Sequence, residues 1–348
     1  MAAESEPLFL LGAGFNADAK AEVGPVWGQS IYVGRHEIAC SYPLVGDLAH
    51  LCFGLAGPPG NESIEELFQR AWESRDFEPI RRLTHALMKA DYFLAERLIP
   101  VFGATPNSYS TFFARFAGSS FLTFNYDSLP ELFLLRQDRW YPHDGYGVPV
   151  DAEVMPGHEH LRERSSGSLV LHLHGSLCLY TSTFTFVQAP GEQIAWHMQR
   201  ERPKYLFDPH SIATLFSPFK QAPMVLGYHP PERRIVAPVP EKAEGLRKEF
   251  ITAVYSRATE LIAASDAPVI AIGYSFNEHD RASYHPILSA VAKNAHARVV
   301  LVLPEAQVLK RRMKLEYPAI SWSAGARTFS AWANAGFPAF SDSSERAV

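Results

Sequence analysis

Three polar side chains, Asn125, Tyr126 and Asp127, come directly after the short apolar run FLTF at 121–124. An amide, a phenol and a carboxylate in sequence can hold a ligand that carries hydroxyl or amide groups, because each of them forms hydrogen bonds. Asp127 can equally cap a helix over the next segment, SLPELFLLR. Asn125 has no such simple structural role, and a buried amide left unpaired costs about 1–3 kcal/mol. We therefore expect Asn125 to bond the backbone, water or a ligand.

A second candidate is HLHG at 172–175, where two histidines follow another apolar run. Side chains alternate along a strand, which predicts His172 and His174 on the same face. A single strand histidine is more often a core residue, whereas a pair, one of them just before Gly175, favours chemistry. Histidine titrates near neutral pH and can act as a general base. Metal binding is the alternative, but two histidines without a nearby Cys or carboxylate make a weak site, and we predict no metal.

Two glycine turns complete the set of candidates. GAGFNA at 12–17 fits the pattern G-x-G-x-x-G/A, in which Gly12 and Gly14 make a tight turn whose backbone N–H groups approach a pyrophosphate. An ordinary strand-to-helix turn explains the same sequence equally well. A dinucleotide-dependent dehydrogenase would also need a second strand ending in an acidic residue, and 30–40, with Glu37, is a poor candidate for it.

The other glycine turn is GYSFNEHD at 273–280. Gly273 allows a close approach of the backbone, and Ser275 offers a hydroxyl group to a sugar or phosphate. The alternative is that this segment is simply the entry to a helix.

The elements that must position these residues are short apolar runs. Each run is of strand length, and its apolar residues are mostly continuous rather than alternating, which is typical of strands covered on both faces of a parallel sheet. The fold class is therefore α/β, a Rossmann-like parallel sheet with helices on both faces, and ligands of such sheets bind at the carboxyl ends of the strands. The runs are PLFLLGAG (7–14), SSFLTFNYD (119–127), SLVLHLHG (168–175), APVIAIGYS (267–275) and ARVVLVLP (297–304).

Two insertions interrupt this single domain, which spans 1–348. Apolar residues at helical spacing predict a helical insertion over 41–117. Prolines interspersed with aromatic residues predict a loop-rich insertion over 176–245. The predicted helices are 61–74, with Asn61 as its cap, 79–99, 106–117, 241–265 and 305–317.

Composition excludes several classes of protein. The chain has 348 residues, 47% of them hydrophobic, so it can bury a sizeable core and is not intrinsically disordered. Its net charge of −5 gives no electrostatic reason to bind DNA or anionic membranes. Its three cysteines form no C-x-x-C pair, which argues against a structural zinc site and favours a reducing compartment. With no basic leader and no apolar run of about 20 residues, we predict a soluble cytoplasmic protein.

In this order the motifs GAG, TFNYD, HLHG and GYS resemble those of the sirtuin-like superfamily, over roughly 270 residues. The segment RIVAPVPEKAEGL at 234–246 is also similar to the Pro-rich segment of that family. The similarity is greatest to the NAD hydrolases of prokaryotic anti-phage defence, because the four zinc-binding cysteines of the deacylases are missing here. At the position after GAG-x, where the family has Ser, this chain has Asn16.

The resemblance implies that 1–348 is an NAD-binding domain that hydrolyses NAD+ to nicotinamide and ADP-ribose. It implies catalytic roles for Asn125 and His174, with His172 supporting them. It also implies that NAD is bound by Gly12, Ala13, Gly14, Asn16, Asp127, Gly273 and Ser275. Asp127 would bond the nicotinamide carboxamide, and Ser275 the adenosine side. The implied partners are further copies of the chain, or a regulatory protein that is Argonaute-like or a DNA-translocating ATPase, with no direct contact to nucleic acid or membrane.

Three other functions remain open. A deacylase or ADP-ribosyltransferase would use the same residues but needs a groove for an acceptor. A non-catalytic nucleotide sensor or interaction subunit would not need both Asn125 and His174. A dehydrogenase would need the acidic second strand that 30–40 does not convincingly supply.

Overall fold

The computed structural model describes residues 6–19, 31–33, 36–38, 45–55, 63–76, 78–99, 105–150, 164–188, 196–207, 232–235 and 249–338. A six-stranded sheet in the order β11-β10-β9-β1-β4-β5 forms its centre, and every neighbouring pair of strands in it is parallel. The strands are β1 (Leu8–Leu11), β4 (Ser120–Thr123), β5 (Val170–His172), β9 (Val269–Ile272), β10 (Arg298–Val302) and β11 (Ser321–Ala324).

The five apolar runs all form strands of this sheet, so the predicted α/β class is confirmed. All four residues of β1 and of β9 are buried, as expected of strands covered on both faces. The sixth strand, β11, was not predicted. Its sequence SWSA has a single large apolar residue, and it lies at the edge of the sheet, where one side needs no apolar cover.

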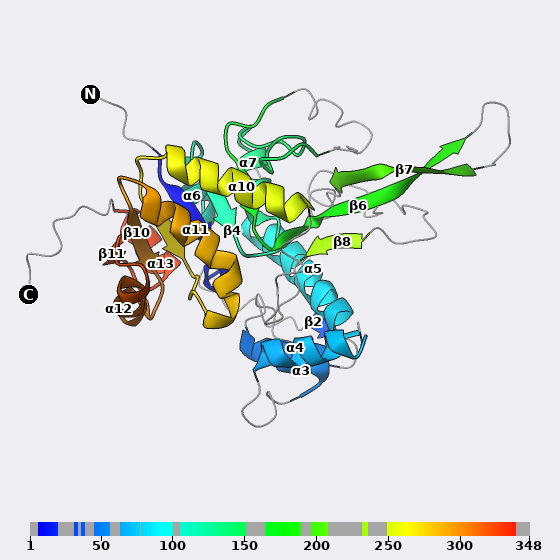
Figure 1. Cartoon of the computed structure of the whole chain (residues 1–348), viewed down its shortest axis with the longest axis horizontal. Coiled ribbons are helices and arrows are strands. Elements are labelled where there is room, and N and C mark those ends of the chain that lie inside the picture. The colour runs from blue at the N-terminus through cyan, green and yellow to red at the C-terminus, as the bar shows by residue number, and fades with distance from the viewer. Residues whose placement is uncertain are drawn as a thin grey trace, which may run out of the picture.

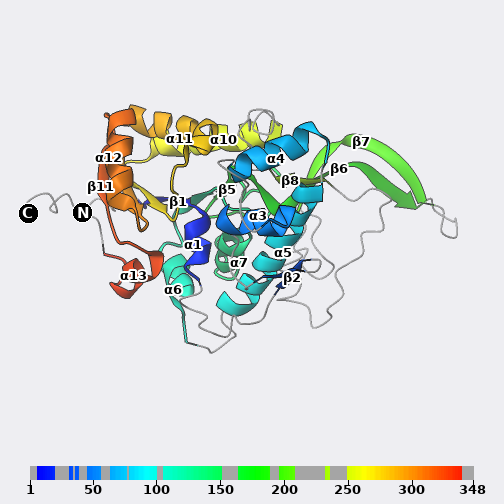
Figure 2. The same cartoon turned by 90° about the horizontal axis from the view of Figure 1, so that it is seen from below.

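Helices cover both faces of the sheet in a three-layer arrangement (Figures 1 and 2). One layer contains α10 (Glu249–Ala264) and α11 (Arg281–Lys293), which pack on each other. Figure 2 shows the other layer below the sheet, and α12 (Ala306–Glu316) beside β10 and β11. The helices of the lower layer are α1 (Ala13–Ala17), α6 (Ser108–Arg115), α7 (Leu129–Leu135) and α13 (Phe329–Asn334).

Helices dominate the described part of the chain between β1 and β4. Besides α1, they are α3 (Val45–Phe53), α4 (Ile64–Glu73), α5 (Glu78–Leu98) and α6. The cap of α4 differs from the expectation, since Asn61 lies outside the described residues and Ser63 is the N-cap. The Ser63 Oγ accepts from the Glu66 N–H at 3.2 Å, and the Glu66 carboxylate accepts from the Ser63 N–H at 2.6 Å.

A small antiparallel hairpin separates the acidic residue Glu37 from the main sheet. It consists of β2 (Ile31–Val33) and β3 (His36–Ile38), which pair with each other and form a sheet of their own. Glu37 therefore does not end a strand of the parallel sheet, which argues against the dehydrogenase alternative.

The segment predicted to be loop-rich contains strands that the sequence analysis missed. They are β6 (Gly175–Gln188), β7 (Trp196–Phe207) and β8 (Glu232–Ile235), which form an antiparallel sheet in the order β7-β6-β8. Figure 1 shows β6 and β7 projecting from the body of the molecule. The run LYTSTFTFV within β6 is rich in β-branched and aromatic residues and was a readable strand signal. Residues 208–231, where many of the prolines lie, are outside the described part.

No helix in the described ranges combines the length and apolar character needed to span a lipid bilayer.

Candidate functional site

The four motifs follow four neighbouring strands and end at the same edge of the sheet. Gly12 follows β1, Asn125 lies just beyond β4, His174 just beyond β5 and Gly273 follows β9, and these strands are adjacent in the order β9-β1-β4-β5. The chain moves from β1 outward to β5 on one side and from β9 outward on the other. The boundary between β1 and β9 is therefore a topological switch point, the place where open α/β sheets bind ligands.

The two glycine turns touch each other at this switch point. The Gly14 N–H donates to the Gly273 carbonyl at 2.9 Å, and the Gly12 N–H donates to the Ile272 carbonyl at 3.0 Å. A Cβ on Gly12 would lie 2.6 Å from the Gly273 carbonyl oxygen. The glycines are therefore required by contact between the turns. Because both glycine N–H groups already have partners, the expectation that they hold a pyrophosphate would require the turns to separate.

Gly273 is the most constrained position of the two turns. Its φ is +64°, and a Cβ there would lie 2.1 Å from the Phe15 nitrogen. We expect Gly273→Ala to lower the free energy of unfolding by about 3 kcal/mol or more, since left-handed backbone strain and a backbone clash add. Gly336→Ala is the matched control, because Gly336 has a φ of +75° with nothing within 4 Å of its Cβ position. It should cost only about 1 kcal/mol. Equal losses of unfolding free energy in Gly273→Ala and Gly336→Ala, measured by urea unfolding, would contradict this account.

A row of rings lies beside these turns, towards α11. Tyr274 and Phe124 stack with their centroids 4.1 Å apart, although β1 separates their strands, and His174 meets Phe124 edge-on at 4.9 Å. A Cβ on Gly12 would be 2.7 Å from the Tyr274 Cβ. The missing side chain of Gly12 therefore leaves room for Tyr274 beside Phe124.

Asn125 is held at three points. Its Nδ2 donates to the Gly12 carbonyl at 3.1 Å, its backbone N–H donates to the Thr123 Oγ1 at 3.0 Å, and its carbonyl accepts from the His172 Nδ1 at 3.0 Å. The Gly12 acceptor fixes the orientation of the amide. No group among the described residues bonds the Asn125 Oδ1. This oxygen is therefore the atom of Asn125 that can serve a ligand.

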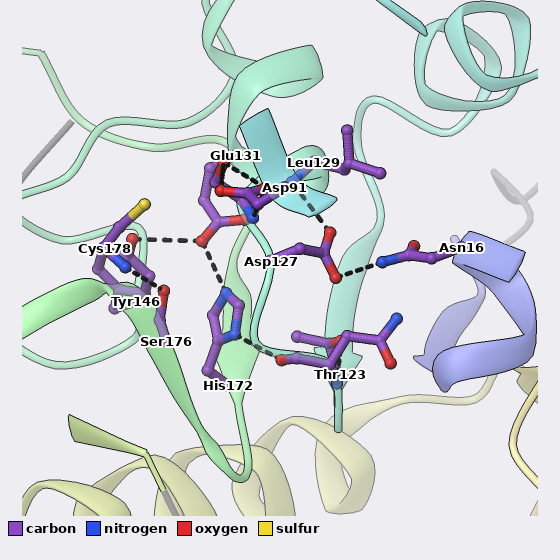
Figure 3. A network of polar contacts seen from close by, with 12 residues as sticks. Asn16, Asp91, Thr123, Asp127, Leu129, Glu131, Tyr146, His172, Ser176 and Cys178 are labelled. Carbon is purple, nitrogen blue, oxygen red and sulfur yellow. Dashed lines mark hydrogen bonds and ion pairs between the residues drawn. The ribbon is translucent and has the colours of Figure 1, made fainter. Parts of the chain in front are cut away.

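His172 is part of a buried ion pair on the α7 side (Figure 3). Its Nε2 lies 2.6 Å from the Glu131 Oε1, and both side chains are fully buried. The Tyr146 hydroxyl donates to the same carboxylate oxygen at 3.2 Å. Burial lowers the pKa of His172, but the charge and hydrogen bond of Glu131 outweigh it, so the pKa is raised. With acceptors at both ring nitrogens, His172 is an imidazolium that supports Asn125 and is not available as a base.

The prediction that His172 and His174 share a face is wrong. Strand β5 ends at His172, and the chain then turns through Leu173 and His174 into Gly175, whose φ is +82°. The His174 Nε2 lies 2.9 Å from the Ser283 Oγ on α11, in the opposite layer from Glu131. The two histidines therefore belong to different sides of the sheet.

His174 nevertheless lies beside the segment that carries Asn125. The ring of His174 contacts Phe124 and lies 6.2 Å from the ring of Tyr126, so it meets the residues on either side of Asn125. Both side chains are almost buried, with exposed fractions of 4% each.

Asp127 lies one residue before Ser128, the N-cap of α7, and bonds the first N–H of that helix, close to the capping role expected as the alternative. Its Oδ1 accepts from the Leu129 N–H at 3.2 Å, at the start of α7, and its Oδ2 accepts from the Asn16 Nδ2. Figure 3 shows this pair joining the segment after β4 to α1. Both carboxylate oxygens thus have partners, so Asp127 would have to leave one of them to bond a nicotinamide carboxamide. Asn16 is also fully buried, and its Oδ1 has no partner among the described residues.

A second carboxylate lies nearby on α5. The Asp91 side chain accepts from the Ser128 N–H at 2.9 Å and from the Ser128 Oγ. Burial, with the charges of Asp91 and Glu131, raises the pKa of Asp127 from 3.8 to about 7, although the hydrogen bond from Asn16 offsets part of this.

The raised pKa of Asp127 makes stability depend on pH. A carboxyl group that binds its proton more tightly in the folded state stabilises the fold below about pH 4, and this stabilisation is lost as the pH rises through about 7. We expect Asp127→Asn to be more stable than the unchanged protein at pH 8, by about 1–3 kcal/mol, and similar to it at pH 4. The amide remains uncharged, and the Oδ1 still caps Leu129. Urea unfolding at both pH values measures this difference in stability. An equal difference at both would show that Asp127 does not titrate between them.

The remaining predicted binding residues line the outside of the turns. Ala13 and Gly14 are half-buried, and Ser275 is exposed. Arg312 of α12 was not predicted from the sequence, and its guanidinium donates to the Phe276 carbonyl and, at 3.3 Å, to the Ser275 carbonyl. Phe276 has a φ of +50°. Arg312 therefore holds the turn that carries Ser275.

Three other residues of the site were also missed: Asp91, Glu131 and Ser283. Glu131 had a detectable signal, because it is the one charged residue in the apolar helix LPELFLL. A lone acid in such a helix must find a partner in the interior. Within the described ranges, no three His, Cys, Asp or Glu side chains are grouped so that they could hold a metal ion.

Comparisons with known proteins add no relative: no protein-family model matches the chain, and the search of curated proteins also found no match. The case for a function therefore depends on the geometry of the site.

Proposed function

We propose that this protein is an NAD+ glycohydrolase, which converts NAD+ and water to nicotinamide and ADP-ribose. The observation that carries the proposal is that the four motifs resembling those of sirtuin-like enzymes follow four adjacent strands at one sheet edge. His174, far from Asn125 in the sequence, contacts there the ring of Phe124, next to Asn125 along the chain. The Asn125 Oδ1 also lacks a protein partner among the described residues.

The chemistry requires little acid assistance. When the bond between the nicotinamide nitrogen and the ribose C1′ breaks, the electron pair stays on nicotinamide, which leaves as a neutral molecule. Positive charge develops on the ribose, and a water oxygen then bonds C1′ and loses a proton. The Asn125 Oδ1 is an acceptor suited to orient that water or a ribose hydroxyl. His174 is the base that takes the proton or binds a ribose hydroxyl.

The other residues position these two. His172 and Glu131 hold the Asn125 backbone, the Asn16–Asp127 pair joins α1 to α7, and Ser275 is exposed where an adenosine could lie. In the wider proposal, also based on the resemblance, the enzyme depletes NAD+ in anti-phage defence. Self-assembly or a regulatory partner would then restrain it, since uncontrolled loss of NAD+ would kill the host cell.

Product analysis tests the proposal. Purified protein is incubated with NAD+ alone and with its genomic neighbour added, and the products are separated by chromatography. Equal amounts of nicotinamide and ADP-ribose support hydrolysis, provided that folded His174→Ala forms neither. Loss of NAD+ only when an acceptor protein or acylated peptide is present would instead indicate transfer or deacylation. A rise in reduced-nicotinamide absorbance would indicate a dehydrogenase, and binding of NAD+ without any turnover, with or without the neighbour, would indicate a sensor.

A further inference from the structure

We propose that Ser283 on α11 is a positioning residue that holds His174 in the tautomer with its proton on Nδ1. The inference rests on the proposed function for its catalytic meaning, but the hydrogen bond itself can be tested without any substrate. Neither the four motifs nor their order along the sequence points to Ser283.

The contact is short and enclosed. The His174 Nε2 and the Ser283 Oγ are 2.9 Å apart, Ser283 has no exposed surface, and they are separated by 109 positions in the sequence. Phe124 contacts the imidazole edge-on. In such surroundings, removing one hydrogen-bonding partner leaves the other with a desolvation penalty of about 1–3 kcal/mol.

A neighbouring phenol favours one direction of the bond. The Tyr255 hydroxyl on α10 is enclosed and has no partner at full bonding distance among the described residues. Burial raises the pKa of Tyr255, and the nearby Ser283 hydroxyl offsets part of this increase. If Tyr255 donates towards the Ser283 Oγ, and Ser283 donates to the His174 Nε2, both hydroxyl protons have an acceptor. The reverse order leaves the phenol proton of Tyr255 without one.

The position of Ser283 along the chain connects it to the GYS turn. The segment from Gly273 continues through a short 3₁₀ helix (Glu278–Asp280) directly into α11, so Ser283 is only eight positions after Ser275. The residue expected to meet the adenosine side and the residue that holds His174 therefore lie on one short segment.

The first experiment reads the tautomer directly. Ring-nitrogen NMR spectra of protein labelled at histidine, with the His174 signal assigned by its loss in His174→Gln, should show a protonated Nδ1 and an unprotonated Nε2. Ser283→Ala should change this pattern. Ser283→Thr, which keeps the hydroxyl group, should preserve it, and Ser283→Cys, which keeps the shape but donates weakly, should resemble Ser283→Ala.

A matched control lies on the same helix. The Ser289 hydroxyl contacts the His285 Nε2 at 3.3 Å, so Ser289→Ala also removes a serine–histidine contact from α11. It should leave the His174 signal and the turnover unchanged. An unchanged His174 signal in folded Ser283→Ala, or a protonated Nε2 in the unchanged protein, would overturn the proposal.

The second experiment measures the consequence for turnover. We expect kcat for NAD+ loss to fall by about 10- to 100-fold in Ser283→Ala, with a smaller change in KM and recovery in Ser283→Thr. With its Nε2 bonded to Ser283, His174 offers its Nδ1–H to a ribose hydroxyl, and without Ser283 that donor is no longer fixed. Full kcat in folded Ser283→Ala would refute the positioning role. If the unchanged protein consumes no NAD+, the proposed function fails, while the NMR comparison still decides whether Ser283 sets the tautomer.

Discussion

Replacing Asn125 with Ala is expected to lower the rate of NAD+ loss by about 100-fold or more. A fixed amide that stabilises charge or orients a reacting group typically contributes this much to a rate. The orientation of Asn125 is set by the Gly12 carbonyl and by the His172 ring, so its Oδ1 is held ready before any substrate binds. The measurement is the initial rate of nicotinamide release at saturating NAD+.

The same substitution also removes a link between β1 and β4, so folding must be measured in parallel. Asn294→Ala is the matched control: the Asn294 Nδ2 donates to the Ile262 and Ser265 carbonyls at 2.6 and 2.7 Å, away from the strand-end motifs. It should reduce stability by a similar amount without lowering turnover. Asn125→Ala that is folded and turns over at the full rate would refute the role given to this amide.

The largest expected effect on stability comes from Glu131→Ala. Removing one partner of a buried ion pair typically costs about 3–5 kcal/mol, because the other charge stays buried without compensation. Here the remaining group is His172, both of whose ring nitrogens face acceptors. Glu131→Gln is the matched variant, since its amide keeps the shape and an oxygen for Tyr146. Glu131→Gln should therefore lower the free energy of unfolding by less than Glu131→Ala does.

The loss in Glu131→Ala should depend on pH in a defined direction. The pKa of His172 is raised in the folded protein, so its stabilisation is complete below about pH 6.5 and is lost as the pH rises through the raised value. Without Glu131, burial lowers that pKa, opposed by the charge of Asp127 and the Asn125 carbonyl, and the protonated form is no longer favoured by an ion pair. The difference in unfolding free energy between the two proteins should therefore be greatest at low pH. A difference that grows from pH 6 to pH 9 would show that His172 is neutral in the fold.

Local reasoning predicted the strands well and the polar contacts poorly. All five apolar runs became strands because burial on both faces demands continuous apolar sequence. The periodicity of strand residues, in contrast, placed His172 and His174 on one face, and this failed because β5 stops at His172. The strand β6 was overlooked because prolines elsewhere in the same segment suggested loops.

The sequence by itself determined that the polar residues after four strands share one edge of the sheet, since continuous apolar runs specify a parallel sheet and parallel strands end together. Only the tertiary structure decided which partners those residues have. Asn16 and Asp127 are 111 positions apart, and His174 and Ser283 are 109 apart, so no local pattern links them. The physical reason is that strand formation depends on the burial of neighbouring residues, whereas a buried polar group is satisfied by whichever partner packing brings within about 3 Å.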